Sequence, residues 1–492
     1  MAATSRPSIA AGGVTGTTGM ACMSAPRPDR RVSAKSAMRA GFTRDPRIGA
    51  RRKGYRERES SPTGCQSGIA STSRTSARSP IFLRVTDFEF QTAHHHGAAR
   101  TGLLKTPHGP VETPAFMPVG THGTIKGLSV EEVASVGGRM VLSNAYHLYL
   151  RPGDLMVRAL GGLHAFTRWD GPMLTDSGGF QVYSLSKMRT VAEQGITFRS
   201  HLDGSLHDYT PEHVVRIERN IGADLIMQLD ELIEGRADEA TSRAAMERSL
   251  RWLERCRAEF DRISREGRAP APVIDTPPGA PALATHDLVA DLVPPLQALL
   301  PIVQGGVHAD LRRASVRGIL GAGDWHAVAI GGLSVGEPKP AMLAMLEVCA
   351  SELPGDKPRY LMGVGHPDDL IEAVARGVDL FDCVAPTRMG RHGTAFTPDG
   401  KVQIRRSSHR TDRRPLVEGC ACSACTRYDR AYLRHLFVAE GMLGLRLLSL
   451  HNVAFLIALM HEARTALRDA RFGSWSEAWL RRYRDGSARA TR

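Results

Sequence analysis

Between residues 114 and 382 the chain repeats one pattern of hydrophobic and polar positions eight times. A short apolar or β-branched run ends in a glycine or a polar residue, and amphipathic segments separate several of these runs. The runs cover residues 115–120, 140–144, 173–176, 225–230, 301–304, 328–332, 360–364 and 380–382. The amphipathic segments cover residues 211–223, 240–262, 308–320, 339–353 and 367–377. Apolar strands alternating with helices predict a buried parallel sheet, and eight units favour an α/β fold of the (β/α)8 TIM-barrel type. An open doubly wound sheet is the alternative.

Three segments interrupt this pattern. Residues 102–112 and 196–209 alternate around His108-Gly109 and Asp203-Gly204, which predicts two hairpins. We expect the first hairpin to lie at the bottom of the barrel. Residues 268–284 are rich in Pro and Ala and predict a surface insertion before the fifth strand. After the barrel we expect a basic stretch, a group of cysteines and two helical segments.

Composition and charge change this picture mainly at the N-terminus. The chain has 492 residues, of which 42% are hydrophobic and 23% charged, with a formal charge of +13. Residues 1–80 hold 15 Lys and Arg against 4 acidic residues, so the remaining 49 basic and 47 acidic residues nearly balance. The overall charge is therefore no argument for nucleic-acid binding by the body of the chain. No run of 18 apolar residues occurs, so we predict no membrane span.

The first 80 residues are rich in Ser, Arg, Gly, Thr and Ala and have almost no aliphatic clusters, so we expect a disordered basic tail. Three interpretations remain open: a transit segment, a flexible tail that helps to hold RNA, and a gene start placed too early, with the true start near Val85. The eight cysteines are not spaced as a disulfide framework, which favours a reducing compartment, and we expect a cytoplasmic protein.

Polar residues stand where four of the predicted strands end. Asp176, Asp230 and Asp382 are carboxylates, and Gln304 precedes a pair of glycines. A single Asp at a strand end is more often the N-cap of the next helix. Four such residues converge on one mouth in a barrel, however, and two carboxylates in one pocket allow a nucleophile and a proton carrier, as in glycoside chemistry.

Three cysteines and one histidine form a second candidate site. The spacing Cys-Ala-Cys-Ser-Ala-Cys, followed by a histidine one helix further on, predicts one structural zinc ion held by four ligands. These ligands are Cys420, Cys422, Cys425 and His451. The alternative is a coincidental group of thiols beside a helix-face histidine.

A local basic run covers residues 401–414. It contains Lys401, Arg405, Arg406, Arg410, Arg413 and Arg414. A solvated charged face is the ordinary interpretation of such a run. Its place between the eighth strand and the cysteines instead suits a track for a phosphate backbone.

Several motifs in register resemble the bacterial tRNA-guanine transglycosylases, also called queuine tRNA-ribosyltransferases. They are Asp176-Ser-Gly-Gly-Phe-Gln-Val182, Gln304-Gly-Gly306, Gly331-Gly-Leu-Ser-Val-Gly-Glu-Pro338, Tyr360-Leu-Met-Gly-Val-Gly365, Phe381-Asp-Cys-Val-Ala-Pro-Thr-Arg388 and the cysteines with His451. The resemblance runs from about Val85 to Tyr483 and leaves out the tail and residues 268–284.

The resemblance implies a role for each matching residue. Asp382 matches the nucleophile that attacks ribose C1′, and Asp176 matches the proton acceptor that prepares the incoming base. The implied substrate-binding residues are Asp176, Ser177, Gly178, Gly179, Phe180, Asp230, Gln304, Gly332, Leu333 and Met362, with Phe180 and Met362 stacking on the purine. The implied RNA-contacting residues are Gly363, Val364, Gly365, His366, Pro367, Asp368, Asp369, Thr387, Arg388, Met389, Gly390 and Arg391.

The family implies a pentosyltransferase that replaces the wobble guanine of tRNAs with GUN anticodons (Asp, Asn, His, Tyr) by a 7-deazaguanine base in queuosine biosynthesis. It also implies a homodimer, one structural zinc ion per chain, and no redox or nucleotide cofactor. The expected domains are the tail (1–80), the catalytic barrel (85–400) and a zinc-binding, tRNA-contacting part with the C-terminal helices (401–483).

Two departures bear on the substrate. Phe180 stands where many members carry Tyr, and Leu232 stands where a Cys is common in members that use 7-aminomethyl-7-deazaguanine. We expect that base, with queuine as the alternative. A non-catalytic tRNA-binding partner subunit is a second alternative, but it would have lost a carboxylate and this chain keeps Asp176 and Asp382. An archaeosine-type enzyme would normally carry a further RNA-binding domain after the zinc region, for which this sequence leaves no room.

Overall fold

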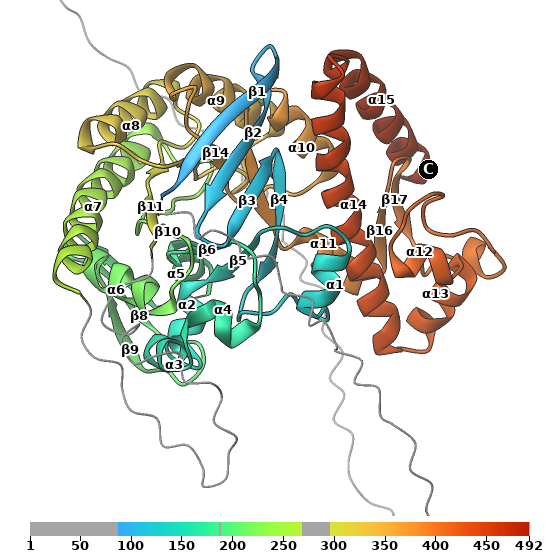
Figure 1. Ribbon diagram of the computed structural model, residues 1–492, viewed down its shortest axis with the longest axis horizontal. Helices are drawn as coiled ribbons and strands as arrows, with labels where there is room; N and C mark the ends of the chain where they lie inside the picture. The colour runs from blue at the N-terminus through green and yellow to red at the C-terminus, as the bar shows by residue number, and fades with distance from the viewer. Residues whose placement is uncertain (1–86, 186–187, 268–295, 492) are drawn as a thin grey trace, which may run out of the picture. The chain divides into compact units, whose positions relative to one another are not determined.

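Nine parallel strand segments form the central sheet of the protein (Figure 1). The computed structural model describes residues 87–185, 188–267 and 296–491. The strands are β4 (Ala115–Gly120), β5 (Val141–Asn144), β6 (Met173–Asp176), β10 (Leu225–Met227), β11 (Ala298–Leu300), β12 (Ile302–Val303), β13 (Val328–Ile330), β14 (Arg359–Leu361) and β15 (Leu380–Cys383). Their order is β11-β10-β6-β5-β4-β15-β14-β13-β12. All eight predicted strands are present.

One strand, divided at Pro301 into β11 and β12, closes the barrel. The sheet order begins with β11 and ends with β12, and these two segments are consecutive in the chain. Pro301 stands between them and has no N–H to donate, so it splits one strand into a half that pairs with β10 and a half that pairs with β13. The predicted (β/α)8 barrel is therefore confirmed, and the open sheet is excluded.

The barrel interior is filled by apolar side chains, and an N-terminal sheet seals its bottom. Strands β1 (Glu89–His96), β2 (Ala99–Thr106) and β3 (Gly109–Thr113) form this antiparallel sheet. Leu104 and Val111 join the cluster of barrel residues that includes Met117 and Leu174. Arg100 on β2 also pairs with the buried Asp379, just before β15, at 2.7 Å. The predicted hairpin and its position are confirmed, whereas β1 was not predicted.

Helices surround the sheet (Figure 1). The five predicted ones are α6 (Pro211–Ile221), α7 (Glu239–Glu266), α8 (Ala309–Ala322), α9 (Lys339–Glu352) and α10 (Pro367–Val374). Five short ones follow earlier strands: α1 (Val130–Ser135), α2 (Ala145–Leu150), α3 (Asp154–Ala159), α4 (Gly162–Thr167) and α5 (Gly179–Leu185). Between α5 and α6 lie β7 (Arg189–Ala192), β8 (Gly195–Arg199) and β9 (Leu206–Tyr209), which contain the second predicted hairpin. The expected insertion at 268–284 and the N-terminal tail lie outside the described residues.

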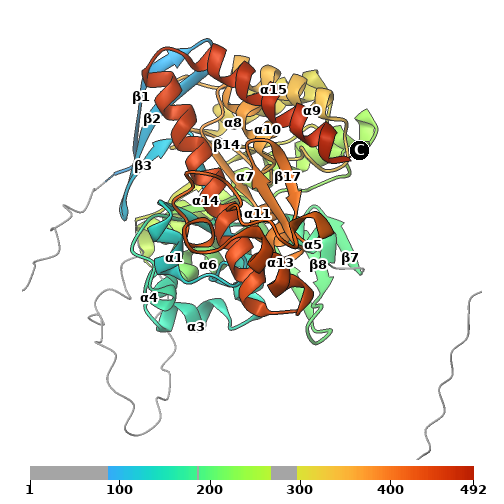
Figure 2. The same ribbon diagram turned by 90° about the vertical axis from the view of Figure 1, so that its right-hand side faces the viewer.

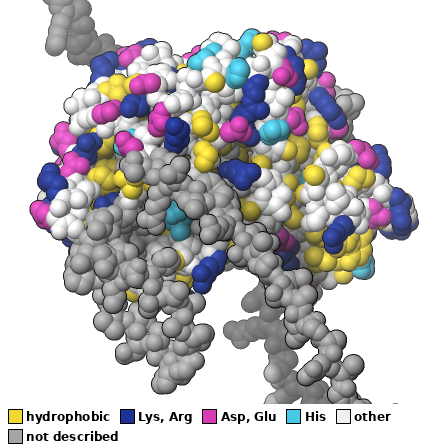
Figure 3. Space-filling view, viewed as in Figure 1, with side chains coloured by type: hydrophobic (Ala, Val, Ile, Leu, Met, Phe, Trp, Pro, Cys, Tyr) yellow, Lys and Arg dark blue, Asp and Glu magenta, His cyan; other side chains and the backbone are white. Residues whose placement is uncertain are grey.

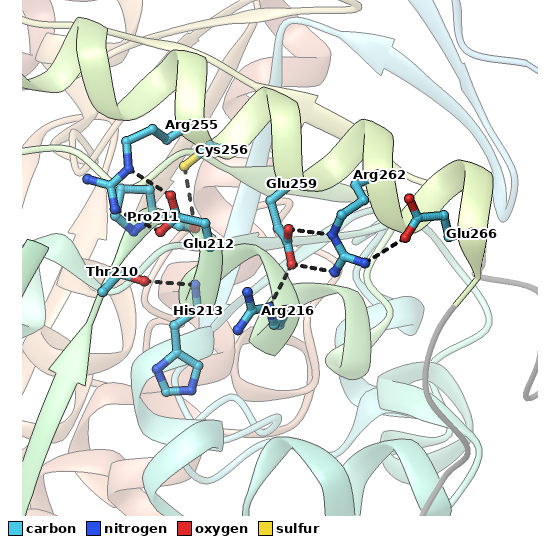
Figure 4. Close-up of polar contacts among 10 residues, drawn as sticks. All are labelled: Thr210, Pro211, Glu212, His213, Arg216, Arg255, Cys256, Glu259, Arg262 and Glu266. Atoms are coloured by element: carbon cyan, nitrogen blue, oxygen red, sulfur yellow. Dashed lines mark hydrogen bonds and ion pairs between the residues drawn. The ribbon is translucent and has the colours of Figure 1, made fainter. Parts of the chain in front are cut away.

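A local signal explains where α6 begins, and buried apolar faces explain how it pairs with α7. The hydroxyl of Thr210 accepts a hydrogen bond from the amide of His213, and Pro211 occupies the first turn of α6. On the outer surface Arg255 forms a two-pronged ion pair with Glu212 (Figure 4). Exposed pairs of this kind contribute little energy each, so the pairing of α6 and α7 rests mainly on their buried apolar faces.

The C-terminal part contains more helices than the two expected. After α11 (Ala385–Arg391) come the hairpin β16 (Thr394–Thr397) and β17 (Gly400–Gln403), a short 3-10 helix (Ser407–His409), and α12 (Ser423–Arg427), α13 (Arg430–Val438), α14 (Met442–Arg468) and α15 (Phe472–Thr491). Figure 2 shows α14 running from α13 past α11 to the N-terminal sheet. By length and composition α14 could cross a membrane, but 67% of its most apolar window is buried inside the protein. A core helix has the same composition, and α14 packs as one.

Candidate active site

Parallel strands place their carboxyl ends at one mouth of the barrel, and the predicted site residues gather there. Asp176 is the last residue of β6, and Asp382 is the last but one of β15. Asp230, Gln304 and Met362 follow β10, β12 and β14 within a few residues. The charges of Asp382 and Asp230 both act on Asp176, so three carboxyl groups from different strands share this mouth.

Hydrogen bonds hold the carboxyl group of Asp382 through one of its two oxygens. The hydroxyl of Tyr360 donates to Oδ1 at 2.7 Å, and the amide of Gly363 donates to the same oxygen at 2.8 Å. Within the described residues Oδ2 has no hydrogen bond. Burial raises the pKa of Asp382, and these two donors oppose that rise. The carboxyl group thus caps no helix, and it presents a free oxygen of fixed direction.

Asp176 lies in a less favourable place for a charge. Its Oδ2 accepts from the amides of Asn144 at 2.5 Å and Gln181 at 3.2 Å, whereas its Oδ1 is buried with no partner within the described residues. Burial and then the charge of Asp382 raise the pKa of Asp176 to about 8. At neutral pH the group is therefore mostly a carboxylic acid that can carry a proton.

Asp230 and Gln304 form a polar pair at the side of the mouth. The amide nitrogen of Gln304 donates to Oδ2 of Asp230 at 2.5 Å, and burial raises the pKa of Asp230 to about 6. The oxygen of Gln304 is buried and accepts no hydrogen bond from any described residue. Buried acceptors are nearly always satisfied, so this oxygen indicates a place for a donor on a ligand.

Two glycines make room for this pair. A Cβ on Gly179 would come within 2.8 Å of Oδ1 of Asp230, and one on Gly332 would collide with the oxygen of Gln304. Gly332 also has a φ of +61°, which disfavours any other residue. Beside Gly179, Phe180 at the start of α5 leaves 52% of its surface exposed, and Ser177 is buried. An open aromatic face next to buried polar groups suits a planar polar ligand.

Seven of the twelve predicted RNA-contacting residues line one cavity of about 530 Å³ beside this mouth. These residues are Gly363, Val364, Gly365, His366, Asp369, Arg388 and Met389. Lys339 holds Asp368 at 2.5 Å and Asp369 at 2.6 Å, which offsets their negative charge. Thr387 is buried, and the tightly packed Gly390 lies against Ser449 of α14. Of the predicted RNA-contacting residues, Arg388 is the arginine that lines this cavity.

The four predicted zinc ligands come together. Their ligating atoms all lie within 4.8 Å of one another, and Nδ1 of His451 lies 3.3, 3.6 and 3.9 Å from the sulfurs of Cys425, Cys422 and Cys420. Zn–S bonds of about 2.3 Å give a tetrahedron with edges of about 3.5–3.8 Å, so this donor set fits zinc. Nε2 of His451 bonds the carbonyl of Phe396 at 2.8 Å, which orients the ring for a metal at Nδ1.

Three polar residues of the site were not predicted from the sequence. Asn144 and Gln181 hold Asp176, and Tyr360 holds Asp382. Asn144 ends a predicted strand, so its position was a usable signal. Tyr360 is the middle residue of β14 and packs in the barrel interior, where the pattern of residue types predicts only packing.

This barrel with paired carboxyl groups at its mouth defines an α/β-barrel enzyme with the groups needed for carboxylate-based transfer. Residues 95–485 match the queuine tRNA-ribosyltransferase family. The queuine tRNA-ribosyltransferase of Symbiobacterium thermophilum is 49% identical over 391 residues, covering 80% of this chain and 90% of that protein. The one from Thermus thermophilus is 48% identical over 395 residues, covering 80% and 94%. The chain belongs to this family of tRNA-guanine transglycosylases.

Proposed function

We propose that this enzyme exchanges the wobble guanine of tRNAs with GUN anticodons for 7-aminomethyl-7-deazaguanine through a covalent ribosyl–aspartyl intermediate. The observation that carries the proposal is the contrast between two carboxyl groups at one mouth. Asp382 is oriented with one free oxygen, while Asp176 is a carboxylic acid at neutral pH. A nucleophile and a proton carrier are the two roles that such an exchange requires.

The exchange takes two displacements at ribose C1′. In the first, Oδ2 of Asp382 forms a bond to C1′, the C1′–N9 bond breaks, and the leaving guanine takes the proton of Asp176. Forming the ester removes the charge of Asp382, which is the second largest cause of the raised pKa of Asp176. Asp176 is then ready to accept the proton from N9 of the incoming base. That base displaces Asp382 from C1′, and two displacements retain the configuration.

Asp230 and Gln304, the polar pair at the side of the mouth, recognise the base. Asp230 and the oxygen of Gln304 face the N–H groups of a guanine edge, Gly332 and Leu333 supply backbone groups, and Phe180 and Met362 stack on the ring. Guanine must leave the anticodon stack to reach them. All 7-deazaguanines share this edge, so it binds the leaving and the incoming base alike.

The choice of incoming base depends on the wall near Leu232. The segment that holds Leu232 lies against Val335, because the amide of Gly235 donates to the carbonyl of Val335 at 3.3 Å. A leucine in that wall leaves less space than a cysteine. This favours 7-aminomethyl-7-deazaguanine over queuine, whose larger ring needs space at the same wall.

The C-terminal part serves the tRNA in this proposal. A structural zinc ion at the four ligands stabilises residues 401–460 of the C-terminal part (401–483), which follows the barrel domain (85–400). In the basic run, Arg413 and Arg414 pair with Asp429 and Asp412. Of the other four cations of the run, we propose Lys401, Arg405 and Arg410 as the ones that bind phosphates. We also propose that the enzyme is cytoplasmic, because its tRNA substrates are in the cytoplasm.

We also propose a homodimer. Figure 3 shows hydrophobic side chains gathered over the region of α12 and α13. Tyr432, Val438, Met442 and Leu443 are 37–79% exposed there. A group of exposed apolar side chains of this kind is typical of a protein–protein interface. Light scattering should give the mass of two chains, and Met442→Glu should lower it to one. A monomeric wild type would contradict the dimer.

The test of the reaction is Asp382→Asn. An amide cannot form the ribosyl ester, so exchange of labelled guanine into tRNA should vanish while tRNA affinity changes by less than about threefold. Asp310→Asn, at a side chain that is 93% exposed, is the matched control and should keep full activity. Exchange by the Asp382 variant would overturn the nucleophile assignment. A wild type that binds tRNA without exchange would support the non-catalytic partner subunit instead.

A further inference from the structure

Arg312 on α8 is a completely buried cation. Its side chain has no exposed surface, and within the described residues no carboxylate pairs with it. Burial lowers the pKa of its guanidinium. A buried arginine destabilises the folded protein unless its N–H groups donate hydrogen bonds. The acceptors of those hydrogen bonds therefore indicate why an arginine is present at this position.

Those partners are four backbone carbonyls from two turns of the barrel mouth. Nε donates to Gly306 at 2.9 Å, and one terminal nitrogen donates to Val303 at 3.0 Å and to Gly331 at 2.7 Å. The other terminal nitrogen donates to Gly332 at 3.1 Å. One planar group thus ties the turn after β12, which carries Gln304, to the turn after β13, which carries Leu333.

These bonds also set the direction of two peptide units. In a trans peptide the N–H points opposite to the C=O. Because the carbonyls of Gly331 and Gly332 face Arg312, the amides of Gly332 and Leu333 face away from α8, toward the barrel mouth. Both residues are buried, and neither amide has a hydrogen-bond acceptor among the described residues. Buried N–H groups without a partner are rare, so these two are donors kept for a ligand.

We infer that Arg312 is a positioning residue that fixes the hydrogen-bonding polarity of the base pocket and thereby sets the affinity for the base without touching it. The inference rests on the proposed function. Ser315, one turn later on α8, supports the same wall by accepting from the amide of Gln304 at 3.1 Å. A lysine cannot replace Arg312, because one ammonium cannot reach four carbonyls in one plane.

The test compares Arg312→Lys with wild type in guanine exchange. The KM for guanine should rise at least about tenfold, while the KM for tRNA should rise by less than about twofold. The wobble guanine meets the same misdirected amides, but the phosphate contacts of the tRNA supply most of its affinity. Arg313→Lys is the matched control, since the neighbouring Arg313 is partly exposed and pairs with Asp310 and Glu352. It should leave both KM values unchanged.

A second variant separates positioning from folding. In Arg312→Ala, millimolar guanidinium should fill the vacated space and lower the KM for guanine again, while methylammonium should not. An unchanged KM for guanine in Arg312→Lys, or KM values for base and tRNA that rise together, would overturn the inference. Failure of wild type to exchange guanine would instead refute the proposed function, so the two failures can be told apart.

Discussion

Asp176→Asn should make the protein more stable at neutral pH while it abolishes exchange. Burial and the charge of Asp382 raise the pKa of Asp176 from 3.8 to about 8. Between these values the folded protein keeps a proton on Asp176 that the unfolded chain releases, so folding must take up that proton. A carboxyl group whose pKa is raised in the folded protein therefore lowers the free energy of unfolding, and this loss grows as the pH rises from about 4 to about 8. Asparagine removes this cost and keeps the shape.

The size of the effect follows from the shift. Each pH unit above 3.8 costs about 1.4 kcal/mol, which amounts to about 4 kcal/mol at pH 7. The new amide also leaves one buried donor unsatisfied at the place of Oδ1, a cost of about 1–3 kcal/mol. We therefore expect a net gain of about 1–3 kcal/mol at pH 7, growing by about 1 kcal/mol per pH unit between pH 5.5 and 8.

Urea titrations of wild type and variant at pH 5.5, 7 and 8 measure this gain. Asp224→Asn is the opposing control. Burial alone would raise the pKa of Asp224, but hydrogen bonds from His108 and His164 outweigh burial and lower it to about 2. The stability from such a depressed pKa is present above pH 4 and is lost as the pH falls through 2, so this variant should lose about 2 kcal/mol at neutral pH. A gain for Asp176→Asn that does not grow with pH would refute the argument.

Three further predictions concern the zinc, the base and the tail. Cys422→Ala should lose zinc and weaken tRNA binding, since the proposed zinc ion holds residues 401–460 together; metal analysis that finds no zinc in active wild type would contradict this. Leu232→Cys should lower the KM for 7-aminomethyl-7-deazaguanine, measured in competition with queuine on tRNA with a GUN anticodon, and efficient queuine use by wild type would refute that assignment. Removal of residues 1–80 should leave kcat unchanged; if the tail holds RNA, the salt dependence of tRNA binding should become shallower.

Much of the fold could be predicted from the chain because each element carries its own signal. A strand buried on both faces needs a short apolar run, and a covering helix needs one apolar stripe, so residues near in sequence reveal both. The strand-end residues Asp176, Asp230 and Asp382 were found in this way, and the barrel topology then placed them at one mouth. The cysteine spacing likewise predicted a ligand set that the fold assembles.

What the sequence by itself determined was therefore the inventory of strands, helices and reactive groups. The tertiary structure decided their state. The pKa of Asp176 depends on burial and on Asp382, which arrives from a distant strand, and the polarity of the base pocket depends on Arg312, a cation on a covering helix. Apolar patterning reflects whether a residue is buried, which its neighbours in the chain share. Electrostatics and hydrogen bonding depend on which groups meet inside, and only the folded barrel brings those groups together.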